Sequence, residues 1–442
     1  MRFAHALTIV AVLVGGNVTL ADYAPEPWNI AARKRFAAQR FGIFIHWGLY
    51  ANYAQGEWYQ QQIGVDTETY GRMMYGFYPS RFNARQWVRA FKEAGAKYVT
   101  ITSRHHDGFS LWPTRVDDGY NIASTPFKRD ILGELAEACR QEGLQLNFYY
   151  SLMDWHRKDY PAGTHAMKVL GPQRGDYASY KRFMMAQIAE LIDSYHPGTI
   201  WFDGEWEHCR KAADMSRLRH EEDPSLLDWE FDDIYDLIHS KQVLVANNNH
   251  AKIREKEDIQ LFERDLPGEN ATGYSVGQTV VQDRPIEQCD VIQTAVWGYR
   301  IEGRDFRSPE DICTLLVKAA AKDSNLLMNI GPNGAGELPD RALVALKGVG
   351  EVVLVPGVLH VEEVKHGHLR AHHAAELLHE AALLAVQLDE QAGLYPREVL
   401  PLLEHAHGVD GVYLPRVERL DDGGVLLLGP LGAYVVPALE PL

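Results

Sequence analysis

Cysteine is scarce in this chain, which has four cysteines in 442 residues. Because they lie far apart, their spacing excludes a zinc site built from paired cysteines and a dense disulfide framework. An oxidising compartment would still allow disulfides, but the sequence does not define which cysteines would pair. We expect all four to be structural: Cys139, Cys209, Cys289 and Cys313.

Basic residues are also few relative to acidic ones. The 44 lysines and arginines are outnumbered by 60 aspartates and glutamates, so the formal net charge is -16. Proteins that bind nucleic acid usually carry an excess of basic side chains, and this chain therefore fits a neutral ligand better than a nucleic-acid partner. No glycine-rich phosphate loop follows any expected strand, which removes support for dinucleotide binding, and no nucleophilic serine motif is present.

Long hydrophobic runs are absent beyond the N-terminus, so we expect no membrane span. The start of the chain combines Met1-Arg2, a short apolar run over residues 6–14 and small residues up to Ala21. This layout is typical of a secretory signal peptide, and a buried N-terminal helix is the alternative. We predict a signal peptide at residues 1–21, a mature chain that begins near Asp22, and a secreted or periplasmic location.

Between residues 28 and 350, short apolar runs alternate with amphipathic stretches. Strands are expected at residues 41–48, 97–103, 144–151, 199–203, 243–246, 259–262, 291–296 and 325–330. Helices are expected at residues 82–91, 130–142, 177–195 and 309–318. Repeated strand–helix units with apolar strands imply a parallel sheet covered by helices. Their number favours an α/β fold of the closed (β/α)8 TIM-barrel type over residues 22–350, rather than an open doubly wound sheet.

Polar and aromatic side chains follow almost every expected strand. Residues 199–203 read Thr-Ile-Trp-Phe-Asp, so Asp203 ends an apolar strand. A single acid there could cap a helix or pair with an arginine. In a barrel, however, the ends of all strands meet at the carboxyl-terminal face, where such enzymes hold their active sites. The other strand ends supply His46, His105, His106, Tyr149, residues 247–249, Glu263 and Trp297.

This set of side chains suits a sugar. Aromatic rings pack against the C–H faces of sugar rings, while histidines, asparagines and carboxylates bind ring hydroxyls. Two carboxylates are the minimum for glycoside hydrolysis. The side chains therefore indicate a carbohydrate-processing site.

The motifs of residues 41–332 resemble those of the α-L-fucosidases of glycoside hydrolase family 29. Any one motif alone would be weak evidence, but the ordered set covers roughly two-thirds of the chain. The resemblance implies an exo-acting retaining enzyme that removes terminal α-L-fucosyl residues from glycans, with no cofactor and no metal. The motifs are Phe-Gly-Ile-Phe-Ile-His-Trp-Gly at 41–48, Gly-Glu-Trp-Tyr at 56–59, His-His-Asp-Gly-Phe at 105–109, Tyr-Tyr-Ser at 149–151 with Asp-Trp at 154–155, Trp-Phe-Asp-Gly at 201–204, Phe-Glu-Arg-Asp-Leu-Pro-Gly at 262–268, Trp-Gly-Tyr at 297–299 and Asn-Ile-Gly-Pro at 329–332.

In the family pattern, Asp203 would be the nucleophile and Glu263 the general acid and base. Such a pair requires carboxyl groups about 5–5.5 Å apart, with a raised pKa for Glu263 while Asp203 stays ionised. Glu287 and Asp265 are rivals for the acid/base, since Glu287 lies in a motif that also recurs in the family. We favour Glu263 because it ends an apolar strand.

The resemblance places fucose binding at His46, Glu57, Trp58, His105, His106, Tyr149, Trp201 and Trp297. A metal site is the alternative for His105 and His106, but adjacent residues of a strand point to opposite faces, which suits one metal ion poorly. Glu57 could instead be a surface acid, and Trp297 a core residue. Tyr149 and Tyr150 cannot both face the barrel interior, and family position favours Tyr149. A basic residue that some relatives have near residues 247–249 is absent, and an asparagine would replace it.

Residues 351–442 differ in composition from the rest of the chain. Relatives carry a β-sandwich here, which needs β-branched and aromatic residues in alternation. This segment lacks Trp, Phe, Ile, Ser, Thr and Asn, and no sandwich pattern is visible. Residues 374–388 have helical character. Three interpretations remain: a lineage-specific helical appendage, a His-rich metal-binding segment, and a reading frame lost near Glu351, which we favour.

Two further functions stay open at this point. The chain could be a non-catalytic fucose-binding protein that retains the motifs. It could also be an exo-glycosidase for another sugar of the same hydroxyl arrangement, such as a galactoside. The sequence leaves the fucosyl linkage, the group attached to the fucose and the oligomeric state undefined.

Overall fold

The computed structural model describes residues 23–116, 119–172, 174–302 and 305–353, together with the backbone of three short strands between residues 416 and 436. The expected signal peptide at 1–21 and the expected helical segment at 374–388 lie outside the described residues.

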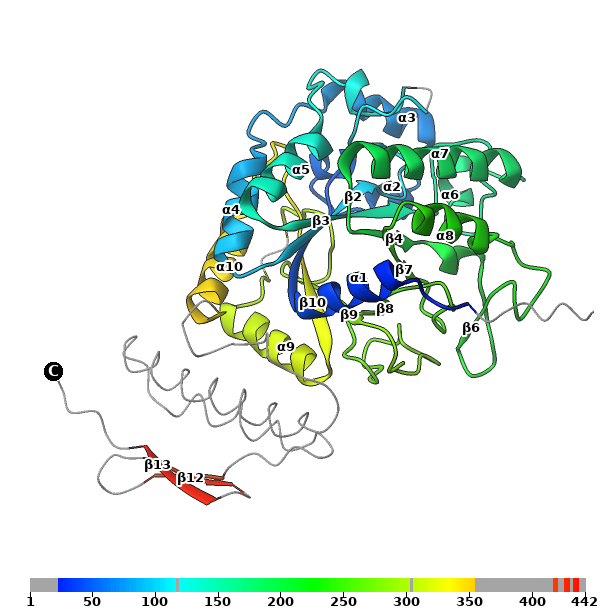
Figure 1. Ribbon diagram of the computed structural model, residues 1–442. Helices are drawn as coiled ribbons and strands as arrows, with labels where there is room; N and C mark the ends of the chain where they lie inside the picture. Colours follow the sequence, from blue (N-terminus) through cyan, green and yellow to red (C-terminus); the bar gives the residue numbers. More distant parts are fainter. Residues whose placement is uncertain are drawn as a thin grey trace, which may run out of the picture.

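Eight parallel strands form the centre of the molecule (Figure 1), in the order β7-β4-β3-β2-β1-β10-β9-β8. A parallel bridge between Ala246 and Ile259 joins the two end strands, β7 and β8, so the sheet curls into a nearly closed barrel. The prediction of a (β/α)8-type TIM barrel is therefore confirmed. The barrel strands are β1 (Phe41–Ile45), β2 (Tyr98–Arg104), β3 (Gln145–Ser151), β4 (Thr199–Asp203), β7 (Leu244–Asn248), β8 (Gln260–Glu263), β9 (Ile286–Val291) and β10 (Ser324–Ile330).

Helices cover the outside of the barrel. The connections from β7 to β8 and from β8 to β9 contain no helix, although residues 249–259 and 264–285 are all described. The α-helices are α1 (Pro27–Ala38), α2 (Tyr59–Ile63), α3 (Thr67–Gly71), α4 (Ala84–Glu93), α5 (Ile131–Glu142), α6 (Met167–Leu170), α7 (Tyr177–Tyr195), α8 (Phe231–Ser240), α9 (Pro309–Ala321) and α10 (Asp340–Val353). Shorter 3-10 turns are η1 (Leu49–Asn52), η2 (Arg72–Gly76), η3 (Ile122–Ser124) and η4 (Glu205–His208).

The bounds of the barrel helices follow from their terminal residues. Asp130 precedes α5 and accepts a hydrogen bond from the backbone of Gly133 at 2.9 Å, while Gly143 ends the helix with a left-handed φ of 75°. Ser308 and Asp311 form a reciprocal capping box at the start of α9. Because these side chains satisfy backbone groups that a helix end leaves unpaired, both helices begin where the sequence indicates.

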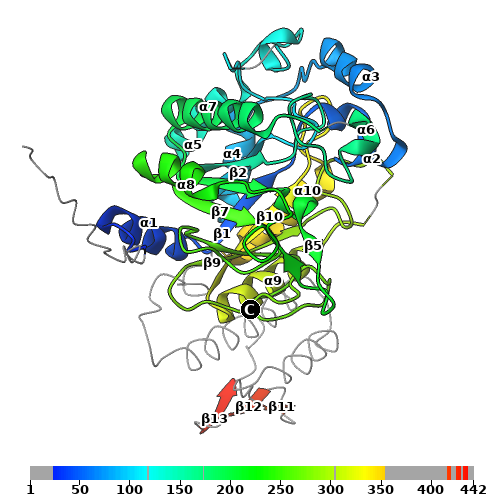
Figure 2. The ribbon, with the colours of Figure 1, turned by 90° about the vertical axis from the view of Figure 1, so that its right-hand side faces the viewer.

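Helix α1 closes the amino-terminal end of the barrel. The Phe36 ring lies 5.3 Å from the ring of Tyr98, the first residue of β2. Asn29 and Arg33 both donate to Oδ1 of the buried Asp258, at 2.6 and 2.7 Å. Figure 2 shows α1 on the opposite side of the barrel from α2 and α6. The other end of the barrel, where the strands finish, is thus left for the loops.

One expected strand is displaced. A strand was predicted at residues 291–296, but the structure places β9 at Ile286–Val291. Glu287, Gln288 and Asp290 make this segment look like a loop in sequence, yet all six residues of β9 are buried. The barrel interior offers partners to such polar groups, for example Tyr98, which donates to Glu287 at 2.6 Å. Residues 292–296 instead continue into the loop that leads to Trp297.

Three strands in the C-terminal segment were not predicted. They are β11 (Arg416–Arg419), β12 (Val425–Gly429) and β13 (Gly432–Val436), and they pair antiparallel in this order. Glycines at 429 and 432 end β12 and begin β13, and glycine is a common turn residue between paired strands. The leucine-rich composition of the segment hid this pattern.

The four cysteines all fall within the described residues, and none of them forms a disulfide. Among the described helices, none combines the length and the apolar character that a bilayer crossing requires.

Candidate active site

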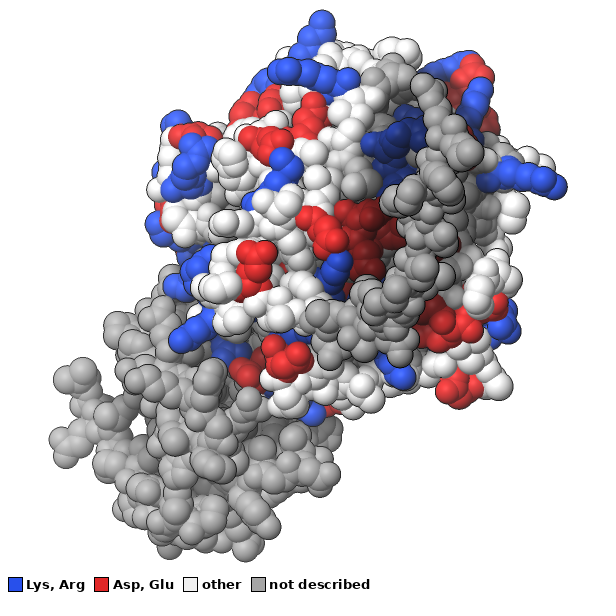
Figure 3. All heavy atoms as spheres, turned by 45° about the vertical axis from the view of Figure 1, so that its right-hand side comes forward, with Lys and Arg blue, Asp and Glu red and all other residues white. Residues whose placement is uncertain are grey.

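A cavity of about 510 Å³ opens among the loops at the carboxyl ends of the barrel strands. Figure 3 shows acidic surface, drawn red, inside a hollow of this face of the molecule. The structure brings all ten predicted site residues together in the cavity lining: His46, Glu57, Trp58, His105, His106, Tyr149, Trp201, Asp203, Glu263 and Trp297.

Asp203 is held by three side-chain donors at the end of β4. Tyr149 donates to its Oδ2 at 2.9 Å, and Trp206 donates to its Oδ1 at 3.0 Å. Asn248 approaches the same Oδ1 at 3.3 Å. Trp206 can return to Asp203 because Gly204 turns the chain with a φ of 101°, a conformation that favours glycine. The carboxylate is thereby fixed at the floor of the cavity.

Glu263 lies beside Asp203, at the end of β8. Asn248 Nδ2 donates to Glu263 Oε2 at 2.7 Å, and the same nitrogen lies 3.3 Å from Asp203 Oδ1. These two oxygens are therefore at most about 6 Å apart, closer to the about 5–5.5 Å of retaining glycosidases than to the about 6.5–9.5 Å of inverting ones. His250 Nε2 lies 3.4 Å from Glu263 Oε2. Both carboxylates remain reachable, since each side chain is 14% exposed.

The surroundings of the two carboxylates differ. Burial raises the pKa of Asp203, but hydrogen bonds from Trp206, Tyr149 and Asn248 oppose that rise by favouring the ionised form. Burial and the neighbouring Asp203 charge raise the pKa of Glu263 to about 7. A pair with such different environments can hold one proton, on Glu263, while Asp203 stays charged.

Two histidines of the cavity present hydrogen-bond acceptors to it. Burial lowers the pKa of His46 to about 3 and the pKa of His106 well below its usual value, so both rings are neutral. His46 Nδ1 lies 2.6 Å from Asn329 Oδ1, and His106 Nδ1 lies 2.7 Å from the Ser151 hydroxyl, which itself donates to the backbone of Met153. Each Nδ1 therefore carries the proton, which leaves each Nε2 as an acceptor for a ligand hydroxyl.

We expected His105 and His106 to point to opposite sides, but the structure contradicts this expectation. Both line the cavity, and their ring centroids are 4.1 Å apart. The reason is that β2 ends at Arg104, so the alternation of a strand no longer applies to the two residues. Within the described ranges, no three His, Cys, Asp or Glu side chains are arranged to hold a metal ion.

Aromatic rings and Glu57 form the walls. The Trp58 ring stacks on Trp206 at 5.8 Å and contacts His106 at 5.2 Å, while Trp297 lies 5.1 Å from His46. The buried Glu57 accepts backbone hydrogen bonds from Trp297 and Gly298 through Oε2, at 3.1 and 2.7 Å. These two hydrogen bonds connect the loop after β1 with the loop after β9.

The rivals for the acid/base role lie outside the cavity lining. Glu287 is buried inside the barrel and accepts hydrogen bonds from Tyr98 at 2.6 Å and Trp201 at 2.9 Å. Burial raises its pKa to about 7, but it does not line the cavity that holds Asp203. Asp265 accepts from the backbone and the hydroxyl of Thr272. Tyr150 lies on the outer face of the sheet, where it donates to Gln187 of α7.

Sequence reasoning missed several residues that contact the two carboxylates. Trp206 and His250 line the cavity, as does Arg217 from the loop after β4, whereas Asn248 belongs to residues 247–249, which were expected at this face. Trp206 and His250 lie in turns, where the sequence has no periodic pattern of apolar residues that would indicate their positions. The signals that could have found them are proximity to Asp203 for Trp206 and the run of asparagines before His250.

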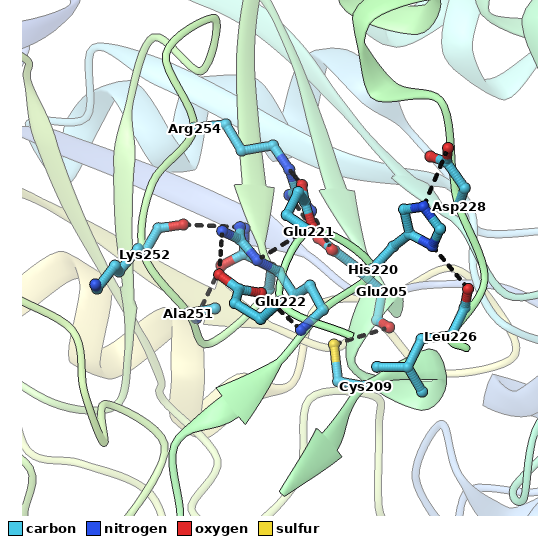
Figure 4. A network of polar contacts seen from close by, with 12 residues as sticks. Glu205, Cys209, His220, Glu221, Glu222, Leu226, Asp228, Ala251, Lys252 and Arg254 are labelled. Atoms are coloured by element: carbon cyan, nitrogen blue, oxygen red, sulfur yellow. Dashed lines mark hydrogen bonds and ion pairs between the residues drawn. The ribbon is translucent and has the colours of Figure 1, made fainter. Parts of the chain in front are cut away.

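A buried ion network supports the same loops (Figure 4). Arg254 pairs with Glu205 and Glu257, and it also donates to Glu221 at 2.7 Å. Asn247 donates to Glu205 at 3.0 Å. Since Glu205 lies two residues after Asp203, and Asn247 precedes Asn248, the network connects the backbones that carry the site.

Comparison with known proteins gives consistent matches. Residues 16–357 match the sequence profile of a family described as alpha-L-fucosidase. The tissue alpha-L-fucosidase of Rattus norvegicus is 28% identical over 393 residues, which cover 80% of this chain and 76% of the relative. The tissue alpha-L-fucosidase of Homo sapiens is 28% identical over 354 residues, with 73% and 67% covered.

Solved structures show the same likeness. Alpha-L-fucosidase isoenzyme 1 from Paenibacillus thiaminolyticus has a TM-score of 0.62 and 32% identity, covering 75% of this chain and 77% of that chain. A GH29 alpha-L-fucosidase from Bacteroides thetaiotaomicron, described as a covalent intermediate trapped with 2-fluoro-fucosyl fluoride, has a TM-score of 0.60 and 26% identity, with 74% and 75% covered.

Proposed function

The chain belongs to the alpha-L-fucosidase family, and we propose that it removes terminal α-L-fucosyl residues from glycans by a double displacement, with Asp203 as the nucleophile and Glu263 as the acid/base. The observation that carries these roles is the position of Asn248 Nδ2 between the two carboxylates, at 3.3 and 2.7 Å. It keeps one oxygen of each within about 6 Å of the other, which supports a double displacement rather than a single one.

In the first step, Asp203 attacks the anomeric carbon while the bond from that carbon to the leaving oxygen breaks. Glu263, whose pKa is raised to about 7, gives its proton to the leaving oxygen. The products are the released alcohol and a fucosyl ester of Asp203. Tyr149 and Trp206 hold Asp203 in the orientation for this attack.

In the second step, Glu263 acts in its ionised form. It takes a proton from water, and the oxygen of that water attacks the anomeric carbon, which breaks the ester bond to Asp203. Fucose leaves with retained configuration, and both carboxyl groups return to their starting protonation. The loss of charge on Asp203 in the ester lowers the pKa of Glu263, since the Asp203 charge is one cause of its rise.

The cavity walls supply the sugar contacts of this proposal. His46 Nε2 and His106 Nε2, the latter 3.6 Å from Asp203 Oδ2, accept hydroxyl protons, and three tryptophans offer ring faces to the apolar side of the sugar: Trp58, Trp201 and Trp297. The volume of about 510 Å³ suits a monosaccharide at the end of a chain.

We also propose export of the protein. The support is the signal-peptide layout of residues 1–21 in the sequence. N-terminal sequencing of the protein recovered from outside its host cell would show a start near Asp22. A start at Met1 would contradict export by this route.

An aryl α-L-fucoside tests the activity. The full chain should release the phenol, and Asp203→Ala should reduce the rate by more than a thousandfold, roughly as removal of a covalent nucleophile does in other hydrolases. The matched aryl galactoside should react far more slowly. Saturable fucose binding without phenol release would favour the binding-protein alternative, and equal rates with both sugars would favour a broader exo-glycosidase.

A further inference from the structure

A small hairpin contributes to the lining of the cavity that holds Glu263. It is formed by β5 (Arg210–Lys211) and β6 (Arg217–Leu218), and it follows η4 directly. Arg217 lines the cavity together with Asp203 and Glu263. Figure 2 shows β5 at the end of the barrel opposite α1, where the strands finish. The hairpin therefore belongs to the face that receives substrate.

Two cations share one face of this hairpin. The antiparallel register pairs Lys211 with Arg217 and Arg210 with Leu218. Directly opposed residues of a strand pair point to the same side, and like charges placed so destabilise the pair. On the other face, Arg210 has a carboxylate partner, Asp223, at 2.6 Å. Lys211 and Arg217 have no ion pair or hydrogen bond with any described side chain.

Nearby acids are already engaged, as Figure 4 shows for part of the segment. Glu205 and Glu221 pair with Arg254, and Glu222 lies 3.7 Å from Arg219. The remaining acids of residues 205–228 bind Ser216, Arg210, His220 or the backbone near residue 165, and they are Glu207, Asp214, Asp223 and Asp228. Outside this segment, the charges of Glu263 and Asp203 act on Arg217, but neither carboxylate forms an ion pair with it, so the two side-by-side cations are open to an anion from outside.

Arg217 lies on the leaving-group side of the site. Burial and the Arg217 charge lower the pKa of His250 to about 3, while the same charge opposes the rise that burial causes in the pKa of Tyr274, and these two rings stack 5.2 Å apart beside Glu263. His46 and Trp297, which would hold the fucose, contact each other, with their ring centroids 5.1 Å apart. Because the acid that protonates the leaving oxygen must face the leaving group, groups that surround Glu263 on the open side contact the sugar attached to fucose.

We propose that Lys211 and Arg217 form a leaving-group subsite for glycans in which the sugar attached to the fucose carries a carboxylate or a sulfate. This inference rests on the proposed fucosidase activity and specifies its substrate class. A planar guanidinium can bind either anion through two parallel hydrogen bonds, and Lys211 adds a second charge at the open edge.

Matched aryl α-L-fucosides test this subsite with the full chain. One phenol carries a carboxylate, one carries a sulfonate in place of sulfate, and neutral fluorinated phenols of the same acidity serve as references. The measured quantity is the ratio of kcat/KM for the anionic over the neutral fucoside. This ratio cancels effects on Glu263 that both substrates share. The wild type should favour at least one anionic fucoside by about tenfold at low salt, and the preference should shrink as salt is added.

Arg217→Gln should reduce the ratio to about one, Arg217→Lys should retain part of it, and Lys211→Gln should lower it by a smaller factor. Arg210→Gln, on the other face of the same hairpin, should leave the ratio unchanged. The carboxylate and sulfonate arms show which anion the subsite prefers. Neutral fucoside turnover with no anionic preference in the wild type would overturn the subsite alone, as would a preference that survives in Arg217→Gln. No turnover of any fucoside would overturn both proposals.

Discussion

The phenol of Tyr149 donates a hydrogen bond to Asp203 across 2.9 Å, between the neighbouring strands β3 and β4. Both residues face the inside of the barrel end, and their strands are paired at Tyr149 and Trp201. The bond stabilises the charged form of a carboxylate that burial would otherwise drive towards the neutral acid. The pairing of β3 with β4 thus helps to keep the proposed nucleophile ionised as well as to position it.

Replacing Tyr149 by phenylalanine removes this donor and nothing else from the carboxylate. We expect kcat/KM for an aryl fucoside to fall by about tenfold to a hundredfold, the usual effect of one hydrogen bond to a charged group. Because the bond lowers the pKa of Asp203, its loss raises that pKa, and the acidic limb of the pH profile of kcat/KM should move to higher pH. Tyr150→Phe, which loses a bond to Gln187 on the outer face, should leave that limb in place. An unmoved acidic limb in Tyr149→Phe would contradict the prediction.

The basic limb of the same profile should belong to Glu263. A general acid works only while protonated, and the pKa of Glu263 is raised to about 7, so kcat/KM should decline as pH rises through that value. Glu263→Gln should abolish this limb and lower kcat/KM by about a hundredfold to ten-thousandfold for a poor leaving group, with a smaller loss for an acidic phenol. Glu287→Gln is the matched control, since burial raises the pKa of Glu287 to about 7 as well. If the limb disappears in Glu287→Gln and persists in Glu263→Gln, the assignment is wrong.

The barrel was predictable because its strands and helix ends carry local signals. The helix expected at 177–195 has the observed bounds of α7, and the strand at 199–203 has those of β4. The ten site residues could be chosen because a barrel gathers strand ends at one face. For β9 the local signal failed, since a buried strand that places Glu287 and Asp290 against internal partners does not look apolar.

Other parts of the site depend on turns, which leave no period in the sequence. Trp206 reaches Asp203 only through the left-handed turn at Gly204, and His250, with a φ of 54°, follows the end of β7 in another such turn. The expectation for His105 and His106 failed for the same reason, because β2 ends at Arg104, before both histidines. Positions that depend on where a strand stops, to within one residue, need the structure.

Arg254 should be essential for stability as well as for the shape of the site. Arg254→Met would leave Glu205, a fully buried acid, without its ion-pair partner, which costs about 3–5 kcal/mol. Urea titration would measure this loss in the free energy of unfolding. Arg72→Met breaks an exposed pair with Glu68 and should change that free energy little. An equal effect of the two substitutions would contradict the importance of burial. Where Arg254→Met still folds, we expect a lower kcat, since Glu205 lies two residues from Asp203.

Asp258 should make the free energy of unfolding depend on pH in the acidic range. Burial alone would raise the pKa of Asp258, but hydrogen bonds and charges from His239, Asn29 and Arg33 hold it below its usual value. A carboxylate with a lowered pKa in the folded state stabilises that state above about pH 4, the usual range for an unfolded aspartate, and this contribution is lost as pH falls through the folded pKa.

Asp258→Asn should therefore lower the free energy of unfolding at pH 7 by about 3–5 kcal/mol, because Arg33 loses its charged partner in a buried site. The difference from wild type should be full above about pH 4 and should narrow below it, as pH falls through the lowered folded-state pKa of Asp258. Urea midpoints measured across this range give the comparison. Asp193→Asn breaks the exposed pair with Lys241 and should cost less than about 1 kcal/mol at any pH. A gap between wild type and Asp258→Asn that stays constant as far into acid as the wild type remains folded would show that Asp258 stabilises α1 through packing rather than through its charge.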